Sequence, residues 1–188
     1  MSRRPFTRLA TAGLAGHVFF ELAAGVGMPF ASVLGPLPAA IGWASGSAAL
    51  GRLAGRSAPS GDRMLAVANG LGAAAVVGHL AGWPRRRTWA GLPWLVDCEG
   101  LGPELMRWYN PIVYVSGVGA VGGLLRENRG APPWLGWSML AAVPLLVRVQ
   151  HAEHRRLRAL AGSRPGWWNR RLQERPVSAQ GGWAPQSP

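Results

Sequence analysis

The stretch MLAVANGLGAAAVVGHLAGW, Met64–Trp83, contains no charged side chain over 20 residues. A helix of about 20 apolar residues crosses the roughly 30 Å of hydrocarbon in a bilayer. Arg63 precedes this stretch and Arg85 follows it closely. Charges that bracket an uncharged segment of this length are typical of a transmembrane helix, so the sequence predicts one here.

Further apolar stretches with the same organisation lie on both sides of it: Leu9–Leu34, Pro36–Ala54, Pro111–Leu125 and Pro133–Gln150. The segment Trp89–Leu101 is shorter and contains two acidic residues, so a re-entrant or surface helix is favoured over a full crossing. The chain is therefore predicted to be all-α. We expect a polytopic transmembrane helix bundle of five spans plus one short re-entrant, interfacial or sixth crossing segment.

Composition is consistent with one membrane domain. Only 15% of the 188 residues are charged, against roughly 25% in ordinary soluble domains. The mean hydropathy of +0.09 is modest because the charges cluster at segment ends and because glycine and alanine score weakly. The net charge is +12, but the arginines flank apolar stretches, so we expect no nucleic-acid partner.

All 20 basic residues are arginine, which together with abundant alanine and glycine is typical of a GC-rich bacterial genome. We therefore expect the bacterial cytoplasmic (inner) membrane. With five spans, 12 arginines fall on the C-terminal side and 8 on the other; with six, the division is 15 to 5. The positive-inside rule predicts a cytoplasmic C-terminus in both cases, while charge favours six crossings and segment length favours five.

The C-terminal part differs in composition from the rest. Residues 1–162 are predicted to form the transmembrane helical domain, and residues 163–188 an Arg/Trp-rich cytoplasmic tail that is partly disordered. Aromatic rings next to arginines suit an anionic lipid surface, so we expect lipid contacts at Trp167, Trp168, Arg170 and Arg171.

Pairs of glycines spaced four residues apart recur in the apolar stretches. In lipid, small residues at this spacing allow two helix backbones to approach closely. Gly42 with Gly46, and Gly119 with Gly123, are therefore predicted helix-packing positions, either within the bundle or against another membrane subunit.

Glu21 is the candidate for chemistry inside the bundle. It lies 12 residues after Leu9, or about 18 Å along a helix, close to the bilayer midplane. His17 precedes it by four residues and therefore shares its helical face. A carboxyl at that depth faces a partner or a pathway. The pair is either a functional centre or a structural hydrogen bond to another helix.

Two histidine arrangements suggest cofactors or metals, and both are disfavoured. His17 and His79 would need similar depths to bind one haem, yet counting residues puts them about 12 Å apart along the membrane normal. His151 and His154 adjoin arginines, which oppose cation binding. One cysteine excludes a cysteine-cluster metal site. We therefore expect no cofactor and no metal.

The loop before Pro111 concentrates acidic residues with the single cysteine, Cys98. Loops beside a membrane often carry binding function. Asp97, Glu99 and Glu104 are therefore candidates for cation binding, for acid–base chemistry, or for docking to another subunit.

No P-loop, nucleophile elbow, zinc-protease or dinucleotide-binding motif is present. The first functional expectation is an accessory, non-catalytic membrane subunit that stabilises or assembles a larger inner-membrane protein complex. The alternative is a small membrane enzyme or transporter that uses Glu21 and His17 to handle a proton, lipid or quinone.

Overall fold

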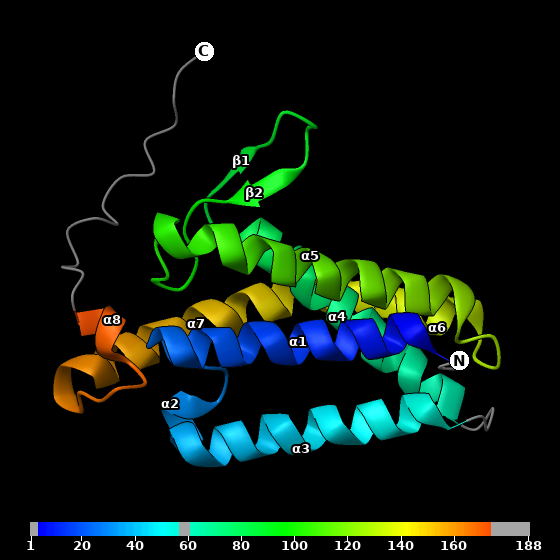
Figure 1. Ribbon diagram of the computed structural model, residues 1–188, viewed down its shortest axis with the longest axis horizontal. Helices are drawn as coiled ribbons and strands as arrows, with labels where there is room; N and C mark the ends of the chain where they lie inside the picture. Colours follow the sequence, from blue (N-terminus) through cyan, green and yellow to red (C-terminus); the bar gives the residue numbers. More distant parts are fainter. Residues whose placement is uncertain (1–3, 57–60, 174–188) are drawn as a thin grey trace.

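The computed structural model describes residues 4–56 and 61–173, and these form a bundle of helices with one small hairpin (Figure 1). The predicted all-α class is confirmed. The helices are α1 Pro5–Ala24, α2 Ala31–Leu34, α3 Pro36–Gly55, α4 Asp62–Gly82, α5 Pro103–Arg126, α6 Pro133–Ser138, α7 Val143–Ser163 and α8 Arg170–Gln173. A 3-10 turn, Met139–Ala142, joins α6 to α7.

Proline and glycine set the helix boundaries. Proline occupies the first turn of α1, α3, α5 and α6, where its missing N–H removes no helical hydrogen bond. Gly25 ends α1 in the left-handed conformation, with φ of 81°, and its N–H donates to the carbonyls of Glu21 and Leu22.

The first apolar stretch is therefore shorter than predicted as a helix. Leu9–Leu34 does not continue beyond Ala24, and Glu21 lies one turn from the end of α1 rather than at its middle. The glycine turn after Ala24 is the physical reason for the break.

Trp89–Leu101 is not a helix, so the predicted re-entrant, surface or crossing helix is wrong. Strands β1 Arg85–Arg87 and β2 Pro93–Leu95 pair antiparallel in this region, and a loop leads from β2 to α5. Asn110 of α5 holds the hairpin: its amide donates to the Leu95 carbonyl over 3.0 Å and accepts from the Leu95 N–H over 2.9 Å. The Tyr114 hydroxyl donates to the carbonyl of Pro93.

The long helical runs α1, α3, α4, α5 and α6–α7 extend between the two ends of the molecule (Figure 1). Small residues allow close approaches between them towards the end at which α1 begins and α6 lies (Figure 1). A Cβ at Gly119 would lie 2.4 Å from the Ala10 nitrogen, and one at Gly70 would lie 2.1 Å from the Gly136 carbonyl oxygen. Larger apolar side chains form a second core near the hairpin, around Val18, Leu101 and Tyr109.

Within the described residues, α4 is the one helix that combines the length and the apolarity needed to cross a membrane. This helix contains most of Met64–Trp83. The other long helices do not meet both conditions, and a polytopic membrane bundle remains a prediction.

Candidate functional site

Glu21 lies in the interior, with 1% of its surface exposed. The Tyr109 hydroxyl, from α5, donates a hydrogen bond to its Oε1. The same oxygen lies 3.9 Å from Nε2 of His79, which comes from α4. Three helices therefore converge on one buried carboxyl.

The two histidines of the apolar helices meet beside this carboxyl. The ring centroids of His17 and His79 are 5.3 Å apart, with planes inclined at 78°. The prediction that the two histidines lie at different depths is wrong. Because α4 is inclined to α1, counting residues along each helix does not give the relative depth of the two rings (Figure 1). Each ring also lies 6.2 Å from that of Tyr109.

A loop closes the site from the hairpin side. Ligand atoms of His79, Cys98 and Glu99 lie within 4.8 Å of one another, as do those of His17, Glu21 and His79. Glu99 adopts a φ of 52°, a left-handed conformation that non-glycine residues rarely occupy. Burial raises the pKa of Glu99 to about 8, and the neighbouring Glu21 carboxyl contributes to this rise. We call His17, Glu21, His79, Cys98, Glu99 and Tyr109 the buried centre.

Three polar atoms of the buried centre make no close hydrogen bond among the described residues: Nδ1 of His17, Oε2 of Glu21 and Nε2 of His79. The Glu99 carboxyl nevertheless interacts with that of Glu21, and the Gly13 backbone interacts with the His17 ring. Buried polar atoms are nearly always paired, since an unpaired one costs about 1–3 kcal/mol. These three atoms therefore have hydrogen-bonding or metal-binding capacity that the described residues fill only weakly.

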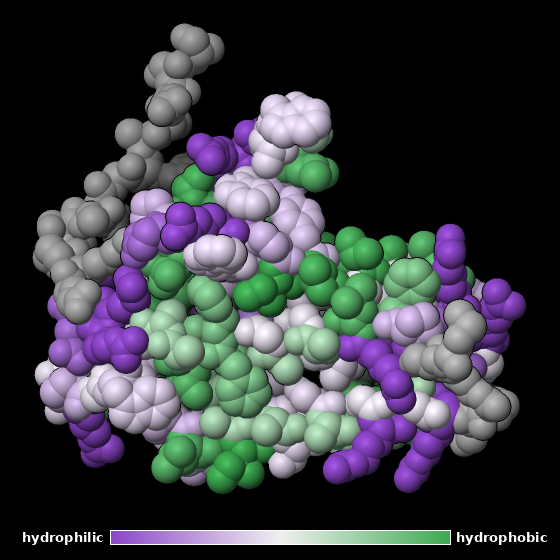
Figure 2. Space-filling model, in the orientation of Figure 1, coloured by the Kyte–Doolittle hydropathy of each residue, from purple (hydrophilic) through white to green (hydrophobic). Residues whose placement is uncertain are grey.

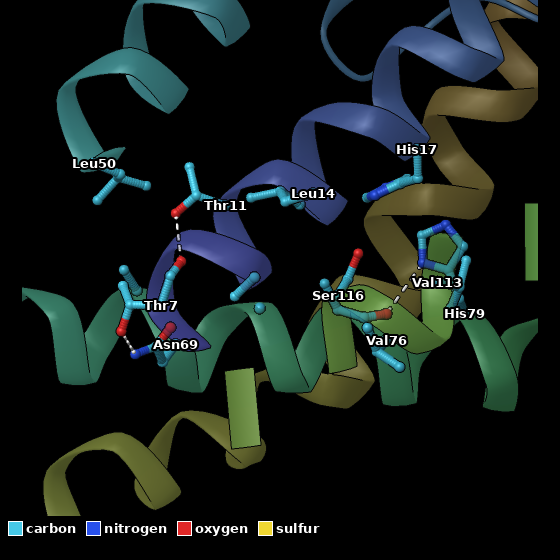
Figure 3. Close-up of a pocket in the computed structure, with 14 residues that line it drawn as sticks. Thr7, Thr11, Leu14, His17, Leu50, Asn69, Val76, His79, Val113 and Ser116 are labelled. Atoms are coloured by element: carbon cyan, nitrogen blue, oxygen red, sulfur yellow. Dashed lines mark hydrogen bonds between the residues drawn. The ribbon is translucent and has the colours of Figure 1, made fainter. Parts of the chain in front are cut away.

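A cavity of about 30 Å³ adjoins the centre between α1, α3, α4 and α5 (Figure 3). His17 and His79 lie at one end of it, and Thr7 with Asn69 at the other, where the Asn69 amide donates to the Thr7 hydroxyl over 2.9 Å. This volume suits one or two water molecules. It is too small for a haem between the two histidines.

The three acidic loop candidates have different positions. Glu99 belongs to the buried centre. The Asp97 carboxylate accepts a hydrogen bond from the Gly102 N–H over 3.2 Å, within the loop. Glu104 is exposed and pairs with Arg171 over 2.8 Å.

The glycine pairs separate into internal and external positions. Gly119 packs against Ala10, and a Cβ at Gly123 would lie 2.4 Å from the Asn69 amide nitrogen, so this pair serves packing within the bundle. A Cβ at Gly42 or Gly46, on α3, would have no atom of a neighbouring element within 4 Å. These two glycines face outward.

The beginning of the predicted tail packs on the bundle. Leu172 is 5% exposed within the larger core, and the Arg171 N–H donates to the Gly25 carbonyl over 3.0 Å. Arg170 donates to the Ala23 carbonyl over 3.1 Å. Trp168 is partly buried, whereas Trp167 is exposed. The disorder predicted for the chain end falls on residues 174–188, outside the described residues.

The sequence predicted the pair of His17 and Glu21 and, separately, Glu99 as a loop candidate, but did not place Glu99 beside the pair. Tyr109 was not among the candidates, and residue counting separated His79 from His17. The available signal was that both are polar residues in otherwise apolar stretches. Comparison with protein-family models, with curated proteins and with solved structures found no match for this chain.

Proposed function

We propose that the chain is a small polytopic protein of the bacterial cytoplasmic membrane, and that it is an enzyme or transporter whose buried centre binds an ion or a water-sized ligand. Glu21, His17 and His79 are the binding residues of this proposal, and Tyr109 positions Glu21. The supporting observation is a carboxyl that is 1% exposed, with unpaired polar atoms beside it on two helices.

The distribution of apolar surface supports the membrane assignment. Large apolar side chains point outward along the bundle, among them Val33 at 70%, Leu37 at 68% and Ile41 at 66% exposure. Contiguous apolar surface of this kind marks contact with lipid or with another protein. On the face in Figure 2, hydrophilic side chains gather towards the two ends, with a largely apolar surface between them.

The hairpin favours five crossings over six. If each long helical run crosses once, the two termini lie on opposite sides, with 12 arginines on the C-terminal side and 8 on the other. The positive-inside rule then orients the C-terminus and the hairpin towards the cytoplasm.

Cavity size restricts the ligand. A quinone ring or a lipid head group needs far more than about 30 Å³. The sequence predicts a proton, a lipid or a quinone as ligand, and of these only the proton is small enough for the space beside His17 and His79.

The proposal is tested with Glu21→Gln, using the exposed Glu104→Gln as the matched control. An amide retains the acceptor for Tyr109 and is less costly to bury than a carboxylate, so Glu21→Gln should melt at or above the wild-type temperature. It should also lose stabilisation by small ions in a thermal-shift screen, while Glu104→Gln retains it.

A lower melting temperature for Glu21→Gln, without any ligand-dependent shift in the wild type, would show that Glu21 is structural. Membrane integration is tested separately. The protein should stay in the membrane pellet after alkaline carbonate extraction, and release into the supernatant would contradict the membrane assignment.

A second candidate function is the accessory subunit of a larger membrane complex, and the outward glycines of α3 favour it. Gly42 and Gly46 leave a shallow surface against which another helix could pack. Gly46→Leu should leave the melting temperature of the isolated chain unchanged and reduce cross-linking to neighbouring subunits. Unchanged cross-linking would contradict this role for α3.

A further inference from the structure

We infer that His17, Glu21 and His79 bind one divalent first-row transition-metal ion, with Zn²⁺ as the best-matched member of that class. The inference rests on the proposed function, because it names the ligand of the same buried centre. Two imidazoles and one carboxylate are the ligand set of many catalytic zinc sites and of non-haem iron sites, in which one or more coordination positions stay open.

The geometry of the three ligands is close to what such an ion requires. Their donor atoms lie within 4.8 Å of one another, and the three side chains are 7%, 1% and 6% exposed in chain order. In a tetrahedral site with metal–ligand bonds of about 2.0–2.1 Å, ligand atoms are about 3.4 Å apart. Shifts of roughly 1 Å in the side chains would bring the donors onto one ion.

The hydrogen bonds around these ligands leave the metal-binding atoms free. Tyr109 engages Oε1 of Glu21, while Oε2 makes no close hydrogen bond among the described residues and the Glu99 carboxyl lies near that of Glu21. Nδ1 of His79 lies 3.1 Å from the Ala75 carbonyl oxygen. The side-chain amide of Gln150 also lies 2.8 Å from this Nδ1, so two contacts hold the ring on that side. In the tautomer that carries its proton on Nδ1, Nε2 keeps its lone pair towards Glu21, as in a metal-binding histidine.

The loop supplies further donors on the other side of His79. Cys98 and Glu99 approach His79 with ligand atoms within 4.8 Å of one another. The positive φ of Glu99 allows the chain to turn its side chain into the interior at this point. Glu99 is half-buried beside the fully buried Glu21 and would offer a further oxygen ligand on this side.

The histidine-rich segment of α7 provides a control, because the polar groups of His151 and Glu153 are already engaged. The Glu153 carboxylate already accepts hydrogen bonds from the Ser32 N–H over 3.0 Å and from the Ser32 hydroxyl over 2.5 Å. His151 Nε2 contacts the Gly82 carbonyl oxygen over 2.9 Å. His151→Gln removes a histidine from α7 without touching the proposed site.

The experiment uses the full chain purified in mild detergent, stripped with a chelator and then titrated with Zn²⁺ or Co²⁺. We expect one ion per chain by elemental analysis and, with Co²⁺, the visible absorption of a low-symmetry, four- or five-coordinate site. His79→Gln and Glu21→Gln should weaken binding by more than the roughly 10–100-fold typical of losing an outer-shell partner, and Tyr109→Phe should fall within that range. His151→Gln should bind as the wild type does.

A wild-type chain that takes up no ion above the buffer blank, or a His79→Gln chain that binds as tightly as wild type, overturns the inference. The melting temperature of each metal-free variant is measured in parallel. A loss of metal binding is attributed to the missing ligand only if the variant is folded like the metal-free wild type. Carbonate extraction and the stability of Glu21→Gln are read without metal. If the wild type binds no metal while carbonate extraction and the melting temperature of Glu21→Gln give the expected results, the metal assignment is overturned and the proposed function is retained.

Discussion

The Tyr109 hydroxyl donates a hydrogen bond to the Glu21 carboxyl across the interface between α5 and α1, with both side chains at most 1% exposed. The bond fixes one carboxyl oxygen, while the other makes no close hydrogen bond among the described residues and the Glu99 carboxyl lies nearby. Tyr109→Phe removes the donor and leaves Oε1 without its hydrogen bond in the interior. We expect a loss of about 1–3 kcal/mol in unfolding free energy, measured by thermal or denaturant melting in detergent. Tyr114→Phe, which loses a bond at the hairpin instead, provides the comparison.

A buried ion pair joins the residue that precedes α1 to the first residue of α4. Arg4 donates to Asp62 over 2.5 Å, and Arg4 also donates to the Arg56 carbonyl over 2.6 Å. Asp62→Ala should cost about 3–5 kcal/mol, because removing one partner leaves the other charge buried. Replacing the exposed Arg63 by Ala should change the melting temperature little. Equal effects of the two substitutions would show that the ion pair is not a stabilising contact.

The two classes of glycine should respond in opposite directions to alanine. Gly119→Ala places a Cβ 2.4 Å from a backbone nitrogen of α1, so the helices must separate. We expect a loss of about 1–3 kcal/mol from overpacking. Gly46→Ala meets nothing within 4 Å and should be neutral or stabilising by up to about 1 kcal/mol through helix propensity. Matched melting curves of the two variants test this distinction.

The hairpin depends on Asn110, which makes three hydrogen bonds: two with the Leu95 backbone and one with the Met106 carbonyl. Asn110→Ala should release the hairpin and the loop that follows it. Cys98, the single cysteine, is 0% exposed in the intact fold, so its alkylation by a maleimide should be slow in the wild type and faster in the variant. Thr88→Ala, at the exposed turn of the hairpin, should not accelerate the reaction. Rapid labelling of the wild type would contradict the burial of this loop.

Several features of this protein follow from local sequence alone. The helical segments are recognisable because proline starts them and uncharged stretches fill them, and both effects act within a few residues along the chain. His17 and Glu21 share a face because helix pitch fixes the relation between positions four apart. The concentration of arginine outside the apolar stretches is also a property of the sequence.

Only the tertiary structure decided which side chains surround Glu21. His79 reaches it because α4 is inclined to α1, Tyr109 because α5 packs closely against α1 through glycine, and Glu99 because the chain turns back after β2 instead of forming a helix. Helix tilt and loop path depend on contacts between residues far apart in sequence, so residue counting along single helices misplaced His79 by about 12 Å. The pattern of one helix determined the pair, and the packing of three helices and a loop determined the buried centre.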